Sequence, residues 1–194
     1  MIKLFNVPEA KRTILRREGS LEPEVPPALQ ASLNKLFGEG ATPETAVTTI
    51  VRDVRQRGDA ALRHWTETLD GVRVASLQVS KAEIAAAIDR IPTDLKEALE
   101  LAASRIRDFH QRQPLPNWQT SEMGGIVGQR VTPIQRVGVY VPGGTAPLPS
   151  SLLMSVIPAQ VAGVPQIVVA TPPGRGDGRI PDVILATAAI AGID

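Results

Sequence analysis

Hydrophobic and polar residues follow two different periods along the chain, and the change of period divides it. Up to about residue 113, apolar residues recur every three or four positions, which is typical of amphipathic helices. The longest such stripe comprises Ala46, Ile50, Val54, Ala61, Leu62, Trp65 and Leu69. Thr42 and Pro43 form a favourable helix start, and Gly71 is a favourable stop. We therefore predict that the first part of the chain is helical.

Other helices are predicted by the same period and by local start and stop signals. They cover Pro8 to Glu18, Ala28 to Phe37 and Thr93 to Gln111. Ser80 and Glu83 have the spacing of a capping box in front of a further short helix. Gly58 interrupts the long stripe, and the sequence leaves open whether it breaks that helix or only weakens it.

Beyond Trp118 the pattern becomes typical of strands. Gly124 and Gly125 lie between two extended segments and predict a β-hairpin. Two continuous apolar runs then follow, Val137 to Val141 and Ile167 to Ala170, separated by a helical segment from Ser150 to Ala162. This order predicts a βαβ unit with parallel strands buried on both faces. A last helix is predicted from Ile180 to Ile190.

The βαβ unit determines where a site is expected. Ligands bind at the carboxyl ends of the strands in such sheets, so the turn after the first strand is the candidate. It reads Pro142-Gly143-Gly144. The chain ends at Asp194, where a third parallel strand is expected, and two parallel strands do not make a covered sheet. We therefore expect an incomplete α/β domain.

Charge and composition narrow the class of protein. Residues 1–117 hold 17 Lys/Arg and 16 Asp/Glu, whereas residues 118–194 hold four of each. We interpret the first part as a helical region and the second as the hairpin and the start of an α/β domain. The net charge of +1 favours neither nucleic acid nor a membrane as partner. The absence of cysteine fits a cytoplasmic protein.

The predicted turn carries none of the common nucleotide-binding fingerprints. It is not G-x-G-x-x-G, no acidic residue follows Ala170 to bind a ribose, and no Gly-Lys-Ser/Thr follows. The residues alone leave a ligand-binding loop and a plain structural turn both open. Tyr140, the only tyrosine, is either a core residue with a hydrated hydroxyl or a ligand contact. His64 and His110 lack partners at metal-ligand spacing.

Several motifs resemble the histidinol dehydrogenase family. They are VGVYVPGG, SSLLM, IPAQVAGV and ATPP, together with RQRGDAALRHWTETLDG from Arg55 to Gly71. The resemblance runs from about Thr42 to Asp194. Family members are about twice this length, so the resemblance implies an N-terminal portion with an incomplete Rossmann-like, aldehyde-dehydrogenase-like domain after a helical arm.

The resemblance also implies an activity. The family oxidises L-histidinol to L-histidine through L-histidinal, in histidine biosynthesis, using NAD and zinc in a cytoplasmic homodimer. It implies that Tyr140 contacts NAD and that Pro142, Gly143 and Gly144 border the cofactor. The family's Glu-His pair and its zinc ligands lie beyond Asp194, so no catalytic or metal-binding residue is predicted here. Two alternative functions remain open. The chain is either a non-catalytic remnant that acts as an interaction module, or a small NAD- or phosphate-binding module.

Overall fold

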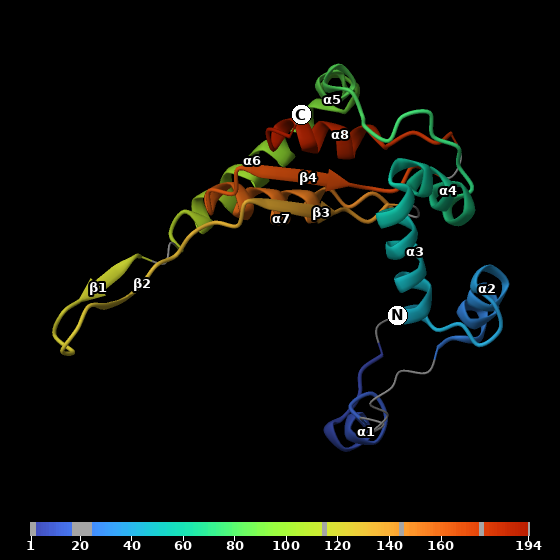
Figure 1. Cartoon of the computed structure of the whole chain (residues 1–194), viewed down its shortest axis with the longest axis horizontal. Helices are drawn as coiled ribbons and strands as arrows, with labels where there is room; N and C mark the ends of the chain where they lie inside the picture. Colours follow the sequence, from blue (N-terminus) through green and yellow to red (C-terminus); the bar gives the residue numbers. More distant parts are fainter. Residues whose placement is uncertain (1–2, 17–24, 114–115, 144–145, 175–176, 194) are drawn as a thin grey trace. The chain divides into compact units, whose positions relative to one another are not determined.

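The computed structural model describes the chain except for residues 1–2, 17–24, 114–115, 144–145, 175–176 and 194 (Figure 1). The contacts divide it into two compact units, residues 1–53 and 54–194. No helix among the described residues is both long enough and apolar enough to cross a membrane.

The first unit is helical. It contains α1 (Val7–Arg12), α2 (Pro27–Phe37) and most of α3 (Pro43–Arg57), which crosses into the second unit. The predictions for α2 and α3 are confirmed within a residue at their starts. The helix expected from Pro8 to Glu18 is shorter than predicted, because Thr13 leaves the helical conformation at φ −118° and ψ −94°. Glu18 lies outside the described residues.

Gly58 breaks the long helix predicted from the apolar stripe and does not merely weaken it. Its φ of 56° is left-handed, so α3 ends and α4 (Asp59–Asp70) begins as a separate helix. Gly71 closes α4 in the left-handed conformation predicted for a helix stop. After a connecting segment come α5 (Lys81–Ala87), the 3₁₀ helix η1 (Ile88–Arg90) and α6 (Thr93–His110).

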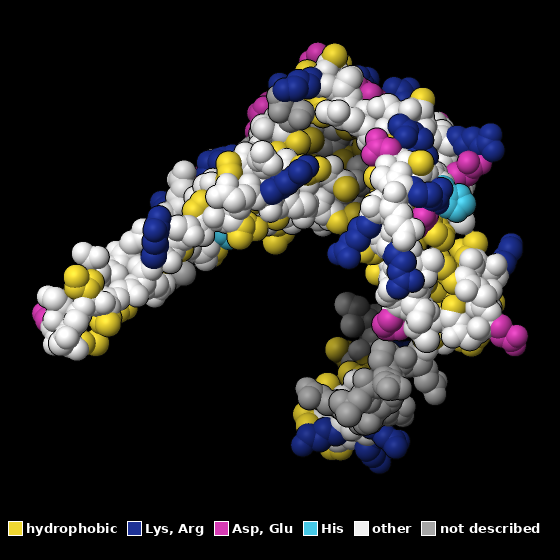
Figure 2. All heavy atoms as spheres, in the orientation of Figure 1, with side chains coloured by type: hydrophobic (Ala, Val, Ile, Leu, Met, Phe, Trp, Pro, Cys, Tyr) yellow, Lys and Arg dark blue, Asp and Glu magenta, His cyan; other side chains and the backbone are white. Residues whose placement is uncertain are grey.

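The predicted hairpin is confirmed. Strands β1 (Trp118–Thr120) and β2 (Val127–Gln129) pair antiparallel, with Trp118 opposite Gln129. Hydrophobic side chains gather on the hairpin surface in Figure 2, where Met123 and Ile126 are strongly exposed.

The predicted βαβ unit is also confirmed. It consists of β3 (Arg136–Tyr140), α7 (Pro149–Val161) and β4 (Gln166–Ala170), and the two strands pair in parallel. Helix α8 (Asp182–Ile190) follows, slightly shorter than predicted. The described chain is therefore of the α/β class, with one small parallel and one small antiparallel sheet.

One hydrophobic core joins the helices of the second unit to its parallel strands. Helix α7 packs on both strands, α6 packs on α7, and α5 packs on α8. The largest fully buried hydrophobic side chains are Val141, Leu152, Leu153, Val156 and Ile157. Because α5 and α6 belong to the charge-rich part of the sequence, the two parts that differ in charge share this core.

The sheet differs from the prediction in its burial. Val139 and Val141 point into the core, but Tyr140 on the opposite face is 67% exposed and Val168 is 45% exposed. The expectation of strands buried on both faces is therefore wrong for the described chain, because the helical layer covers only one face of the two-stranded sheet. The open face matters for the site, since it leaves the Tyr140 ring accessible.

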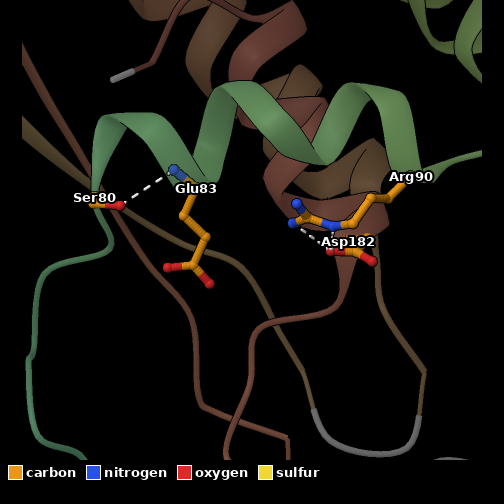
Figure 3. A network of polar contacts seen from close by, with 4 residues as sticks. All are labelled: Ser80, Glu83, Arg90 and Asp182. Carbon is orange, nitrogen blue, oxygen red and sulfur yellow. Dashed lines mark hydrogen bonds and ion pairs between the residues drawn. The ribbon is translucent and has the colours of Figure 1, made fainter.

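An ion pair fixes η1 on the start of α8. The Arg90 guanidinium donates to Asp182 Oδ1 from Nε at 2.8 Å and from Nη2 at 2.7 Å (Figure 3). The hydrogen bond from Arg90 lowers the pKa of Asp182 below its ordinary value, and the charge of Arg90 adds to this effect. Asp182 also lies in the first turn of α8, where a negative charge is favourable.

We expect Asp182→Asn to lower the melting temperature by no more than a few degrees at neutral pH. Both side chains are about two fifths exposed, so solvent screens the pair. A lowered pKa in the folded state means that the contribution exists above the ordinary Asp value of about 3.9 and disappears as the pH falls through the folded value. Thermal melts across the acidic range measure this, and a difference between variant and parent that persists in strong acid would contradict it. The double variant with Arg90→Gln should lose no more than Asp182→Asn alone.

Candidate functional site

The carboxyl ends of the two parallel strands lie level with each other. Tyr140 is paired with Ala170 in the register of the sheet. The pairing extends one residue further, because the Val141 backbone N–H donates to the Ala170 carbonyl at 2.9 Å. The loops that follow β3 and β4 therefore leave the sheet side by side, which is the arrangement in which α/β proteins bind ligands.

Gly143 is required where these two loops meet. A Cβ atom at this position would lie 2.9 Å from Pro172 Cγ and 3.3 Å from the Pro172 carbonyl oxygen. Gly143 is not among the described glycines with positive φ, so the need for glycine here is spatial and not conformational. Pro172 therefore occupies the space that a side chain at position 143 would fill, and the two loops pack closely here. Gly144, the next residue of the predicted turn, lies outside the described residues.

Tyr140 and Pro142 occupy different environments at this edge. Tyr140 ends β3 on the open face of the sheet and is exposed in the described chain. Pro142 is half-buried and follows Val141, which is fully buried in the core. The structure thus places an exposed aromatic ring and the Gly143–Pro172 contact on either side of the buried Val141.

The loop after β4 is closed by its own hydrogen bonds. The Gly174 N–H donates to the Arg179 carbonyl at 3.0 Å, and the Arg179 N–H donates to Asp177 Oδ1 at 3.0 Å. Gly178 has a φ of 71°, and a Cβ there would lie 2.8 Å from Val72 Cγ1. These contacts hold the loop against the segment that precedes α5.

Two hollows adjoin this loop. The larger, about 540 Å³, is mainly apolar and is lined by β4, α8 and the residues around Leu77. The smaller, about 250 Å³, lies between the loop and the segment before α5, and Glu83 and Thr171 are among the residues that line it. The sequence pattern does not indicate either as a site residue, because Glu83 comes to this loop only through tertiary packing and the missing partner of the Thr171 hydroxyl is visible only in the fold.

The described residues offer no metal site. Neither His64 nor His110 belongs to a group of three or more His, Cys, Asp or Glu side chains that could hold an ion in the part of the chain described. His64 instead contacts the ring of Trp65 edge to face at 5.1 Å between centroids.

The fold defines an α/β protein whose candidate ligand site is the carboxyl edge of a parallel strand pair. Comparison with known proteins identifies the family. The family model "Histidinol dehydrogenase" matches residues 38–194, so the chain belongs to the histidinol dehydrogenase family.

Individual relatives agree with this assignment. The histidinol dehydrogenase of Deinococcus radiodurans is 49% identical over 182 residues, which cover 94% of this chain and 41% of the relative. The histidinol dehydrogenase of Geobacillus kaustophilus is 50% identical over 149 residues, which cover 76% of this chain and 35% of that relative. The crystal structure of histidinol dehydrogenase from Elizabethkingia anophelis matches with a TM-score of 0.73 at 34% identity, covering 87% of this chain and 39% of that one. The chain thus spans about two fifths of the length of the relatives it matches.

Proposed function

We propose that this chain is the NAD-binding portion of an enzyme that oxidises L-histidinol to L-histidine through L-histidinal. The observation that carries the proposal is the exposed Tyr140 ring at the carboxyl end of β3, beside the Gly143–Pro172 contact. Membership of the histidinol dehydrogenase family supplies the reaction. The Rossmann-like character of the sheet belongs to the same proposal.

The residues at the edge fit a dinucleotide. An exposed tyrosine offers a flat face for a planar ring and a hydroxyl that stays hydrogen-bonded. Gly143 lets the loop after β3 pack against Pro172 of the loop after β4, so that both loops flank the same edge. When bound, NAD would accept one hydride in each oxidation, a first NAD molecule from the alcohol and a second from the hydrated aldehyde. In this proposal the chain binds and orients the cofactor through Tyr140, Pro142, Gly143 and Gly144.

Zinc enters the proposal only through the family. The described residues do not fit a zinc centre, since none of them form a group of three or more suitable side chains. We therefore assign no zinc ligand and no catalytic acid or base to them. The proposal further includes a cytoplasmic homodimer, and the exposed apolar residues of the open face are compatible with a covering surface.

A genetic test addresses the reaction. A chimera in which this chain replaces the matching two fifths of the Deinococcus radiodurans relative should restore growth of a strain that lacks its own histidinol dehydrogenase, on medium with L-histidinol in place of histidine. The Tyr140→Ala chimera should grow markedly less well at equal protein level. If the parent chimera accumulates as folded protein but gives no growth and no NADH from histidinol, the chain is a binding or interaction module without the proposed role.

A further inference from the structure

The smaller cavity at the carboxyl end of β4 is lined by polar groups from several parts of the second unit. Thr66 comes from α4, Ser76 and Gln78 from the segment before α5, and Glu83 from α5. Thr171 and Arg179 come from the loop after β4. At about 30 Å³ per water molecule, a cavity of about 250 Å³ has room for a sugar ring. The cavity therefore combines polar and apolar walls, is large enough for a small ligand, and lies next to the predicted cofactor edge.

The Glu83 carboxylate is available because the capping box is only half formed. Ser80 Oγ accepts from the Glu83 backbone N–H at 3.2 Å, as the sequence predicts. In a complete capping box the Glu side chain also reaches back to the backbone N–H of the cap residue. Figure 3 shows instead that the carboxylate points away from Ser80 and from Arg90, whose guanidinium is bound to Asp182. This carboxylate is half-buried, and its charge contributes to raising the pKa of Arg90 above the ordinary value, after the larger effect of the hydrogen bond to Asp182.

Thr171 is a second polar residue that lines the cavity. Its hydroxyl oxygen is buried and has no hydrogen-bond partner among the described residues. A buried hydroxyl without a partner is unfavourable, so such groups in native proteins usually have a bonding role. Thr171 directly follows Ala170, the residue paired with Tyr140, and this places the hydroxyl at the candidate cofactor edge.

The chemistry of these groups favours a sugar that carries neighbouring hydroxyls. A carboxylate only accepts hydrogen bonds, whereas each hydroxyl of a diol donates one. In dinucleotide-binding folds an acidic residue beyond the second strand bonds the ribose hydroxyls. The residues directly after β4 here are Thr171, Pro172 and Pro173, none of them acidic. Glu83, which is remote in sequence, is the acidic residue among the described residues that line the cavity.

We propose that this cavity binds a ribose of the dinucleotide, with the Glu83 carboxylate accepting from the ribose hydroxyls and the Thr171 hydroxyl completing the contact. The inference rests on the proposed NAD-binding function and adds a sugar site to it. Tyr140 lies on the open face of the sheet and Thr171 on the core side, so the cofactor spans the carboxyl edge between them. A 2′-phosphate on the same ribose would meet the Glu83 carboxylate, so the pocket favours NAD over NADP. Arg179 also lines the cavity but is exposed, so solvent screens its charge more than that of the half-buried Glu83.

Calorimetric titration of the whole chain with NAD and with NADP tests this inference. We expect Glu83→Gln to weaken NAD binding about tenfold, the size expected for hydrogen bonds to a charged group, and to reduce the preference for NAD over NADP. The Ser80 cap survives in this variant because it uses the Glu83 backbone N–H. Asp89→Asn removes the same charge from an exposed position on η1 and should change neither affinity.

Thr171→Val gives an independent readout. It should weaken NAD binding severalfold without lowering the melting temperature, because it removes a hydroxyl that has no partner among the described residues. If NAD binds the parent and Tyr140→Ala weakens it, but Glu83→Gln and Thr171→Val leave NAD affinity and the NADP ratio unchanged, the ribose site is wrong and the proposed function stands. If the folded parent chain does not bind NAD, both fail together.

Discussion

Replacing Tyr140 by alanine is expected to weaken NAD binding by about tenfold or more while leaving the melting temperature almost unchanged. Stacking of an aromatic side chain on a base contributes about 1–3 kcal/mol when measured by alanine substitution. About 1.4 kcal/mol corresponds to a tenfold change in affinity. The ring is 67% exposed, so its removal takes little from the core. Titration calorimetry and thermal melts on the same samples measure the two effects.

Two variants sharpen the Tyr140 prediction. Tyr140→Phe retains the ring, so it should lose at most about 1 kcal/mol of binding free energy if the hydroxyl bonds the cofactor. Trp118→Ala removes another exposed aromatic side chain, from β1 and not from the edge, and should leave NAD affinity as it was. A lowered melting temperature with unaltered NAD affinity in Tyr140→Ala would show that the residue is structural.

Gly143→Ala is expected to reduce both stability and NAD binding. Its Cβ would lie 2.9 Å from Pro172 Cγ, a stiff ring atom, so the two loops must separate. Forcing an extra methyl group into a packed contact costs about 1–3 kcal/mol. In a chain of this length that corresponds to a fall of roughly 2–4 °C in melting temperature for each kcal/mol. Binding weakens as well, because the displaced loops are the ones that flank the cofactor edge.

Gly138→Ala is the matched control. Gly138 lies in the same strand, its φ is not positive, and a Cβ there would meet nothing within 4 Å. Such a substitution is expected to be neutral or to stabilise by about 0.4–1 kcal/mol. The double variant Gly143→Ala, Pro172→Ala should recover part of the lost stability, since the clashing ring atoms are gone. Equal melting temperatures for the two glycine variants would contradict the spatial role of Gly143.

The sequence predicts the local elements well because their signals are local. The apolar runs of β3 and β4 and the turn residues Gly124 and Gly125 determine strands and hairpin without reference to distant residues. The effect of Gly58 was left open, since only the folded backbone reveals its left-handed φ. The burial of both sheet faces was predicted wrongly, because a continuous apolar run does not show whether a helix layer is present on each side.

The candidate site was only partly predictable. The motif around Tyr140 predicts a site at the carboxyl edge of the strands, but it does not show whether the Tyr140 ring is buried. The steric role of Gly143 depends on Pro172, which lies on another loop. Glu83 reads as a capping residue in sequence, and only the fold reveals that its carboxylate points away from the cap. Each of these properties arises from contacts between residues far apart in the chain.

The most direct test of the central claim is an NMR titration of the isotopically labelled chain with NAD. We expect saturable shifts of the amide signals of Tyr140, Val141, Gly143 and Thr171, at the carboxyl ends of the strands. The amide signals of Arg136 and Gln166, at the amino ends, should not shift. Shifts confined to the amino ends or to the hairpin, or no saturable shifts in the folded chain, would contradict NAD binding at this edge.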